Sequence, residues 1–249
     1  MSIILKSERE IAAMRQAGRI VAAVLEVLKS KLRPGMKTKE LDIIATRQLK
    51  KLGAKPSFKG YRGFPASLCV SINDEIVHGI PGERVIDEGD IVSLDLGAIF
   101  DGFQGDAAIT VALGKAGPQA IRLVKTAEGA LEAGIAAAYP GATLGDISAA
   151  IQGYAESRGY SVVREYTGHG IGRQMHEEPH IPNFGRPGEG PGLKKGLTIA
   201  LEPMVNAGDW RTRLGSNRWL VLTADGSLSA HFEHTIAITD GEPEVLTTL

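Results

Sequence analysis

The spacing of apolar residues predicts that the chain begins with two helices. Apolar positions recur at helical intervals from residue 11 and stop at Arg33-Pro34-Gly35. Ser7 and Glu10 have the spacing of a capping box, so the first helix is expected to start after Ser7. A second helix is predicted from Thr38, which can cap it, to Gly53. Its apolar positions are expected to face one way: Leu41, Ile44, Ala45, Leu49 and Leu52.

Strands are predicted next, followed by a second helical pair. Apolar and polar positions alternate over residues 68–72, 76–80 and 91–96. The dipeptide Asp101-Gly102 is typical of a hairpin turn and leads into a strand over 107–113, so one acid stands on each arm, Asp95 and Asp106. Helices are predicted again over 118–138 and from Thr143 to residue 159.

The second half of the chain repeats the order of the first. Pro34 to Gly53 and Pro140 to Gly159 each span 19 positions, at an offset of 106. Residues 90–95 align with 197–202 at an offset of 107, and 77–80 resemble 168–171 at an offset of 91. We infer two copies of a helix–helix–strands unit related by an approximate two-fold axis. Two polar segments of the second copy, 183–196 and 209–218, are expected to be surface loops near the functional face.

Composition indicates a globular protein without a strong charge preference. A chain of 249 residues with 43% hydrophobic residues can form a sizeable core, and a net charge of −1 gives no support for nucleic-acid binding. Cys69 is the single cysteine, which excludes an intrachain disulfide, and early charges argue against a signal peptide. No run approaches the roughly 18 apolar residues of a membrane span. The protein is expected to be cytoplasmic and without membrane contact.

Four acids on predicted strands form a candidate metal site. Asp95 and Glu202 each close an apolar run, Asp106 lies across the hairpin, and Glu233 lies in 229–236. Taken alone, Asp95 or Glu202 is more simply a salt-bridged structural acid, but four clustered carboxylates cannot share a water-poor site without cations. His169, between two glycines, adds a nitrogen ligand. This set suits two ions of Mn²⁺, Fe²⁺, Co²⁺ or Zn²⁺, whose shared water would act as the nucleophile of a two-metal hydrolase.

These motifs resemble those of the type I, bacterial-like methionine aminopeptidases over essentially the whole chain. The matching segments are Val77-His-Gly-Ile-Pro81, Asp95 with Asp106 eleven residues later, Gly168-His-Gly-Ile-Gly172 with His176-Glu-Glu-Pro179, Glu202-Pro203, and Leu228 to Ile236. The resemblance implies an α+β pita-bread fold in one catalytic domain, residues 1–249. Two pseudo-symmetric helix-helix-strands halves, about 1–113 and 114–249, would surround a central antiparallel sheet.

The resemblance also implies an activity and the residues that perform it. The enzyme would remove the initiator methionine from nascent chains with a small second residue, by attack of a hydroxide bridging two divalent metal ions. Asp95 would chelate one ion, Asp106 and Glu233 would bridge both, and His169 and Glu202 would complete the other, with Glu202 also accepting a proton. His78 and His176 would hydrogen-bond the scissile peptide and stabilise the tetrahedral intermediate. The alternative for His78 is a hydrogen bond to a loop carbonyl.

By the same resemblance, an apolar pocket would receive the methionine side chain. Its wall would consist of Phe58, Tyr61, Phe64, Cys69, Met175 and Trp219, although each of these alone is more simply a core residue. Phe58 stands where relatives often have a small residue or Cys, and Met175 where an aromatic residue is frequent. His231 stands where Gln is common. The resemblance favours a monomer that contacts the ribosome transiently.

Two other functions and a second type of the same enzyme are the alternatives. The proline-directed relatives, aminopeptidase P and prolidase, share the metal set but carry an N-terminal domain, for which there is no room ahead of a helix starting at Ser7. The second methionine aminopeptidase type has an insertion before the last glutamate, but Glu202 and Glu233 are only 31 positions apart. A metal-free binding module with this fold would be expected to have lost one of the five ligands, and all five are present.

Overall fold

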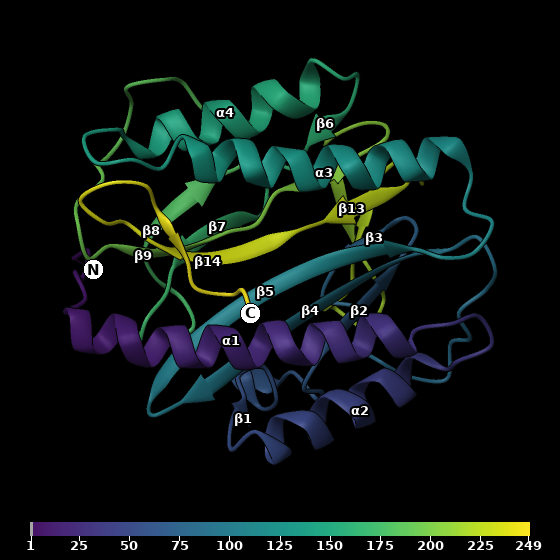
Figure 1. Cartoon of the computed structure of the whole chain (residues 1–249). Helices are drawn as coiled ribbons and strands as arrows, with labels where there is room; N and C mark the ends of the chain where they lie inside the picture. The colour runs from purple at the N-terminus through teal and green to yellow at the C-terminus, as the bar shows by residue number, and fades with distance from the viewer. Residues whose placement is uncertain (1) are drawn as a thin grey trace.

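The computed structural model describes residues 2–249 and places two helical pairs on opposite sides of a group of strands (Figure 1). The helices are α1 (Glu8–Lys31), α2 (Thr38–Lys51), α3 (Pro118–Ala136) and α4 (Leu144–Glu156), with a 3₁₀ turn, η1, at Tyr61–Gly63. The strands are β1 (Lys55–Pro56), β2 (Cys69–Ile72), β3 (Glu75–Val77), β4 (Ile91–Phe100), β5 (Phe103–Ala112), β6 (Ser161–Val162), β7 (Thr167–Gly170), β8 (Glu177–Pro182), β9 (Thr198–Leu201), β10 (Met204–Asn206), β11 (Thr212–Leu214), β12 (Val221–Thr223), β13 (Ser229–His231), β14 (Glu233–Ala237) and β15 (Glu244–Val245).

The first helix begins where its sequence predicts. Ser7 is the N-cap of α1: its hydroxyl accepts the Glu10 N–H at 3.4 Å, and Glu10 Oε2 accepts the Ser7 N–H at 3.0 Å. The predicted capping box is therefore confirmed. Thr143 likewise caps α4, where Asp146 accepts its backbone N–H at 2.7 Å.

The start of α2 corrects one expectation. The N-cap is Lys37, whose backbone N–H is accepted by Glu40 Oε1 at 2.8 Å, so Thr38 is the first helical residue and not the cap. The Thr38 hydroxyl instead accepts the Gly82 N–H at 2.8 Å and so holds a distant loop. Leu52 was expected on the buried face, but it follows the helix end and is 40% exposed.

The predicted central antiparallel sheet is confirmed. Nine strands of the described chain pair in the order β1-β4-β5-β14-β9-β7-β8, with β2 also beside β4 and β15 beside β14. Its longest ladder joins β4 to β5 from Ile91↔Ala112 to Phe100↔Phe103, longer than the period-two pattern predicts. Asp101 and Gly102 both have positive φ, 48° and 77°, as a type I′ hairpin turn requires.

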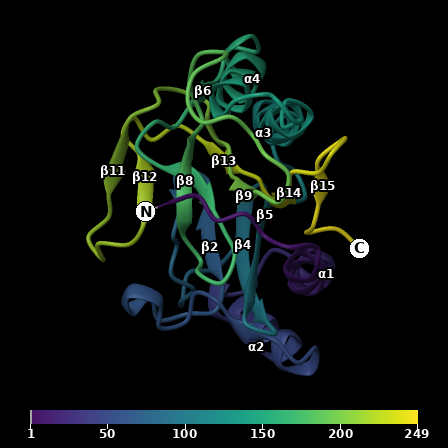
Figure 2. The same cartoon turned by 90° about the vertical axis from the view of Figure 1, so that its left-hand side faces the viewer.

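Each helical pair has its own core against this sheet. Buried side chains of α1 and α2 pack with β2 and β4, whereas those of α3 and α4 pack with β9 and β14. Seen from the side, α3 and α4 lie above the strands, and α1 and α2 lie below and to one side, with the β11–β12 hairpin away from α1 (Figure 2). The arrangement leaves the helix-free side of the sheet for the site.

One of the two expected loops contains regular structure. The segment 183–196 holds no helix or strand, but 209–218 includes β11, which pairs with β12, and β12 pairs in turn with β3. The segment 209–218 is therefore partly a hairpin arm and not the loop that its polar composition predicts. None of the helices in residues 2–249 is both long and apolar enough to cross a bilayer.

Candidate metal centre and substrate pocket

Five adjacent strands each carry one of the predicted ligands to the same place. Asp95 lies on β4, Asp106 on β5, Glu233 at the start of β14 and His169 on β7, while Glu202 directly follows β9. Asp106, His169 and Glu233 each offer one atom within 4.8 Å of the others. His169 Nε2 is 3.6 Å from Glu202 Oε1 and 4.0 Å from Asp106 Oδ2. The sheet order thus brings together acids that are far apart in sequence.

The chemistry of these residues fits divalent cations. Asp95 Oδ1, Asp106 Oδ1 and Glu233 Oε1 are buried and have no hydrogen-bond partner in residues 2–249. Burial raises the pKa of all four carboxyl groups, and repulsion between them raises the pKa further for Asp106, Glu202 and Glu233. Each orphaned buried oxygen costs about 1–3 kcal/mol. A set of buried acids without a Lys or Arg partner among the described residues is therefore suited to bound metal ions.

His169 is held in the tautomer that a metal needs. Its Nδ1 lies 2.9 Å from the carbonyl oxygen of Gly170. Because a carbonyl can only accept, Nδ1 carries the proton and Nε2 keeps its lone pair toward Glu202. Burial also lowers the pKa of His169 to about 3, so the imidazole is neutral at pH 7.

The glycines on either side of His169 are needed because β7 is crowded. A Cβ at Gly168 would lie 2.5 Å from the Ala200 carbonyl oxygen of β9, and a Cβ at Gly170 would overlap the Glu178 carbonyl of β8. Neither glycine has positive φ, so close packing and not turn geometry demands them. The two neighbouring strands therefore fix the position of His169.

A cavity beside the ligands is lined by every residue predicted for the methionine pocket. Its volume is about 150 Å³, roughly five times the volume share of one water, which suits a short unbranched side chain. The lining residues outside the ligand set are Phe58, Tyr61, Arg62, Phe64, Cys69, His78, Met175, His176 and Trp219. Arg62 was not predicted. It has a φ of 49° within η1, and nothing in its sequence surroundings distinguishes it from an ordinary surface arginine.

The apolar wall is a set of packed rings and sulfur-containing side chains. Phe64 contacts Phe58 edge to face at 6.5 Å and Trp219 at 5.2 Å between centroids. Cys69 pairs with Asp95 across β2 and β4, and burial raises the pKa of its thiol. Met175 is buried. The two departures from the family pattern, Phe58 and Met175, therefore both line the cavity.

His78 is held in an unusual backbone conformation at the cavity edge. Its φ of 63° lies in the left-handed region that few non-glycine residues adopt. Its ring stands edge to face with Tyr166 at 6.0 Å and Trp219 at 6.4 Å. The alternative for His78 was a hydrogen bond to a loop carbonyl. Within residues 2–249 no such bond joins its ring nitrogens to a carbonyl. Burial lowers the pKa of His78 to about 4, so the ring is neutral at pH 7.

His176 lines the same cavity beside His169. Its Nδ1 is 2.8 Å from the Tyr61 hydroxyl, and its ring stacks on Tyr61 at 5.3 Å. The centroids of the His176 and His169 rings are 4.2 Å apart. Burial is the first cause that lowers the pKa of His176 to about 4, and Arg62 is the second. By contrast, His231 does not line the cavity, and neither of its ring nitrogens has a partner in the described chain.

The chain is similar to proteins of known sequence and structure along nearly all of its length. Residues 12–240 match the model of metallopeptidase family M24. The chain is 52% identical over 246 residues to the methionine aminopeptidase of Clostridium acetobutylicum, covering 98% of each. It is 52% identical over 245 residues to methionine aminopeptidase 1 of Bacillus subtilis, covering 98% of this chain and 99% of that one. The crystal structure of the Thermotoga maritima methionine aminopeptidase superposes with a TM-score of 0.98 at 45% identity, over 100% of both chains.

Proposed function

This chain belongs to metallopeptidase family M24 as a methionine aminopeptidase of the bacterial type, and from that premise we propose which of its residues remove the N-terminal methionine. The observation that carries the proposal is the juxtaposition of an oxygen-rich ligand set with an apolar cavity of about 150 Å³. The ligand set holds the amino terminus and the reacting carbonyl, and the cavity holds the first side chain.

Five residues would hold two divalent ions, of Co, Mn, Fe or Zn: Asp95, Asp106, His169, Glu202 and Glu233. Bound ions of this kind supply positive charge that polarises a carbonyl and lowers the pKa of water. The orphaned oxygens of Asp95, Asp106 and Glu233 support a direct role in holding them. The Glu202 side chain is 16% exposed, at the open edge of the set, and takes the proton of the attacking water.

The methionine side chain enters between Phe58, Phe64 and Trp219. These rings exclude water from the first residue and leave room for a flexible thioether. The second residue of the substrate then lies beside His78, whose ring is already packed against Tyr166 and Trp219. A large second side chain would have to displace one of these rings, so a small one is preferred.

His78 and His176 donate hydrogen bonds to the scissile peptide. Both imidazoles are neutral at pH 7 because their pKa is lowered to about 4, so each has one N–H to donate and one lone pair. His176 has Tyr61 on its Nδ1, which leaves Nε2 for the substrate. A donor that is already oriented stabilises the charge that develops on the carbonyl oxygen, an effect worth about 3 kcal/mol.

The function is tested by release of free methionine from a Met-Gly-Met-Met peptide, beside a matched Xaa-Pro peptide. Chelator-stripped protein is titrated with Mn²⁺ or Co²⁺. Methionine release that depends on the metal and occurs from the first peptide alone is expected. Cleavage of the Xaa-Pro peptide alone would assign the chain to its proline-directed relatives, and cleavage of neither would favour the binding module.

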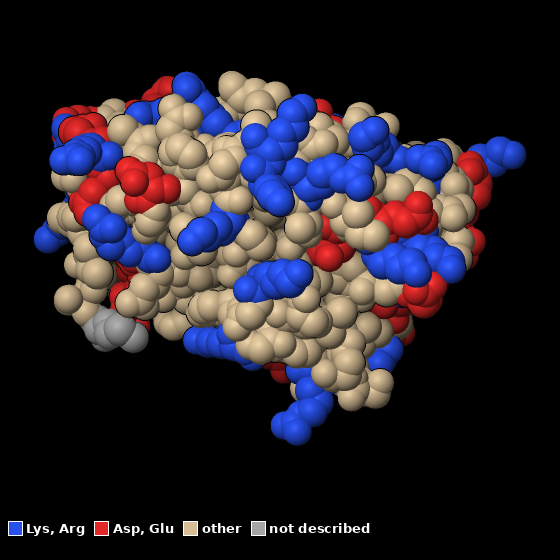
Figure 3. Space-filling model, turned by 90° about the horizontal axis from the view of Figure 1, so that it is seen from below, with Lys and Arg blue, Asp and Glu red and all other residues tan. Residues whose placement is uncertain are grey.

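We also propose that the protein contacts a partner, the ribosome, transiently. Lys and Arg outnumber acids over much of the face seen from the α1 and α2 side (Figure 3). Lys29 and Lys31 end α1, and Lys50 and Lys51 end α2. A nascent-chain substrate puts the reaction in the cytoplasm. Pelleting of the monomeric protein with ribosomes at low but not high salt is expected, and it should weaken when Lys50 and Lys51 are changed to Glu.

A further inference from the structure

A buried ion pair joins the N-terminal segment to the residue that follows His176. Lys6 Nζ lies 2.5 Å from Glu177 Oε2, and the two side chains are only 3% and 7% exposed. The partners are 171 positions apart in the sequence. Because burying two charges costs solvation energy that their attraction does not reliably return, such a pair contributes little to stability by itself. Because the pair lies next to His176, it points to a role in the catalytic site rather than in stability.

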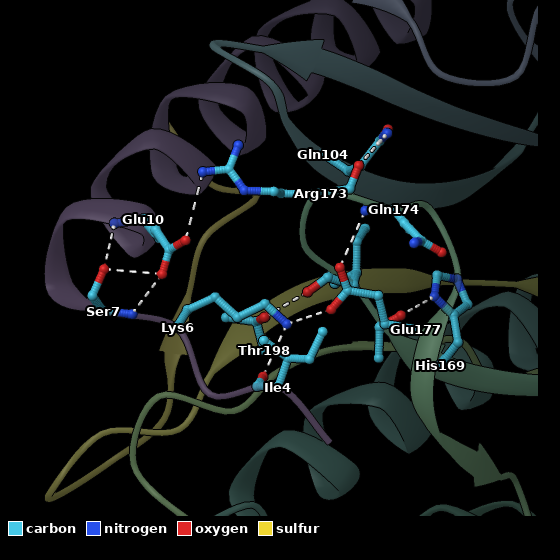
Figure 4. A network of polar contacts seen from close by, with 12 residues as sticks. Ile4, Lys6, Ser7, Glu10, Gln104, His169, Arg173, Gln174, Glu177 and Thr198 are labelled. Carbon is cyan, nitrogen blue, oxygen red and sulfur yellow. Dashed lines mark hydrogen bonds and ion pairs between the residues drawn. The ribbon is translucent and has the colours of Figure 1, made fainter. Parts of the chain in front are cut away.

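Further hydrogen bonds hold both members of the pair (Figure 4). Glu177 Oε1 accepts the backbone N–H of Gln174 at 3.1 Å. Lys6 Nζ also donates to the Ile4 carbonyl at 3.0 Å, and the Lys6 backbone N–H donates to the Gly196 carbonyl at 2.7 Å. Lys6 is therefore held at both its backbone and its ammonium group.

The pair packs directly on the loop that links β7 to β8. A Cβ at Gly172 would lie 2.7 Å from Glu177 Oε1 and would overlap Lys6 Cε. Any side chain at position 172 would therefore have to displace the ion pair. On the other side of the loop, Gln104 donates its backbone N–H to the Gly172 carbonyl at 2.8 Å and its side-chain amide to the Arg173 carbonyl at 3.3 Å.

This anchor lies one residue from His176. Glu177 is the first residue of β8 and pairs with Gly170 of β7, whose carbonyl orients His169. The protein covers the His176 ring only in part, and its one hydrogen bond to the described chain is that to Tyr61. The backbone at residues 176 and 177 carries the ring, so the contacts of the ring with Tyr61 and His169 depend on where that backbone lies.

We propose that Lys6 is a positioning residue for His176. By neutralising Glu177 where little water can reach it, Lys6 fixes the start of β8, from which His176 reaches the scissile peptide. Without the ammonium group Glu177 is a buried, unpaired charge, and turning toward water moves the backbone that carries His176. The inference rests on the proposed role of His176, and it makes the segment before α1 part of the active site.

A double-mutant cycle tests the proposal. Lys6→Met, His176→Ala and the double variant are compared for kcat, KM and bound Mn²⁺ with Met-Gly-Met-Met as substrate. Lys6→Met is expected to lower kcat about 10- to 100-fold, with KM and metal content within about twofold of the parent. In the His176→Ala background the same change should alter kcat by less than about twofold, because the residue through which Lys6 acts is gone.

Three further variants separate positioning from loss of structure. Lys195→Met removes an exposed ion pair of equal length, 2.5 Å to Asp240, and should leave kcat unchanged. Glu177→Gln keeps an oxygen acceptor for Lys6 and should retain kcat within about threefold. The double variant Lys6→Met/Glu177→Gln leaves no buried charge, so it can be measured even if Lys6→Met alone unfolds. With no buried charge left to turn toward water, its kcat should return to within about threefold of the parent, and a loss as large as that of Lys6→Met would overturn the charge argument.

Equal losses of kcat in both His176 backgrounds, an unchanged kcat in Lys6→Met, or a fall in bound Mn²⁺ would each overturn the positioning role. Absence of methionine release by the parent protein would instead overturn the proposed function, so the two failures are distinct.

Discussion

At the scale of single residues, burial has opposite effects on the two kinds of titratable group in the site. It raises the pKa of the four carboxyl groups and lowers the pKa of His169 to about 3 and of His78 and His176 to about 4. The imidazoles are therefore neutral at pH 7, as the proposed roles of ligand and hydrogen-bond donor require. The carboxyl groups are fully ionised only when a cation lies among them.

His169→Ala should remove bound metal and activity together. The imidazole is the one nitrogen ligand of the proposed set, and its Nε2 lies 3.6 Å from Glu202 Oε1. Turnover is expected to fall more than about 100-fold. Mutation of a residue that only hydrogen-bonds to a metal ligand already lowers metal affinity or activity about 10- to 100-fold. The measurements are metal content after dialysis and methionine release. His180→Ala is the matched control, because His180 pairs with His169 across β7 and β8 but is exposed. Full metal content in His169→Ala would contradict the ligand assignment.

His78→Gly should lower kcat about 100-fold and leave the metal bound. Glycine adopts the φ of 63° found at His78 without strain, so the loss reports the imidazole and not the backbone. The measurement is kcat at saturating Mn²⁺ together with metal content. A variant with parental kcat would return His78 to a structural role.

At the scale of elements, the site depends on how closely α1 approaches the sheet. Gly105 of β5 faces α1, and a Cβ there would lie 2.7 Å from the Gly18 backbone nitrogen. A Cβ at Gly18 would overlap the Leu246 carbonyl of the C-terminal segment. Helix, strand and C-terminal segment therefore meet at a point where no side chain fits, one residue along β5 from Asp106.

Gly18→Ala should destabilise the protein even though alanine favours helix. The gain in helix propensity is at most about 1 kcal/mol, whereas overpacking costs about 1–3 kcal/mol, so a net loss of about 1 kcal/mol is expected. Gly153→Ala in α4 is the matched control, because its Cβ meets nothing within 4 Å. It should stabilise by about 0.5–1 kcal/mol. Urea unfolding in chelator measures both, and stabilisation by Gly18→Ala would contradict the packing argument.

At the scale of the whole molecule, the sequence predicts those features that repeat locally. The sequence predicts the capping box at Ser7, the Asp101-Gly102 turn and the meeting of five proposed ligand residues, and the duplication predicts two helical pairs around one sheet. The division into halves at residues 113 and 114 stays a prediction. The sequence does not show that β4 continues to Phe100, because Gly97 and Ala98 are weak strand formers and the pairing of Ile99 with Lys55 sustains it.

Long-range polar contacts are the part that pattern cannot supply. The Thr38 hydroxyl bonds Gly82 and not its own helix, although its position in the sequence is that of a cap. Lys6 and Glu177 each resemble ordinary surface charges, and only the fold brings them together. The resemblance to a known family predicts the pocket residues. Arg62 also lines the pocket, but nothing in the sequence around it marks it as a pocket residue.

The stability of the whole molecule should depend jointly on pH and on bound metal. A buried carboxyl group with a raised pKa stabilises the folded state while it is protonated, and this contribution is lost as pH rises through the folded-state pKa, about 7 for Asp95. The buried histidines act oppositely because their pKa is lowered by folding. They stabilise the folded state as pH rises, and this stabilisation is complete above the ordinary histidine pKa of 6.5. From pH 6.5 to 8, therefore, the carboxyl groups alone should make the chelated protein less stable as pH rises.

Metal ions compensate the same charges, so the stabilisation by Mn²⁺ should increase over this pH range. Urea unfolding at pH 6.5, 7.25 and 8 in chelator and in saturating Mn²⁺ measures it. Asp95→Asn removes one of the four acids and should flatten the pH slope in chelator while leaving the fold intact. A chelated protein whose free energy of unfolding rises with pH, or a metal increment that is constant, would mean that the four acids are not the uncompensated buried cluster that their orphaned oxygens indicate.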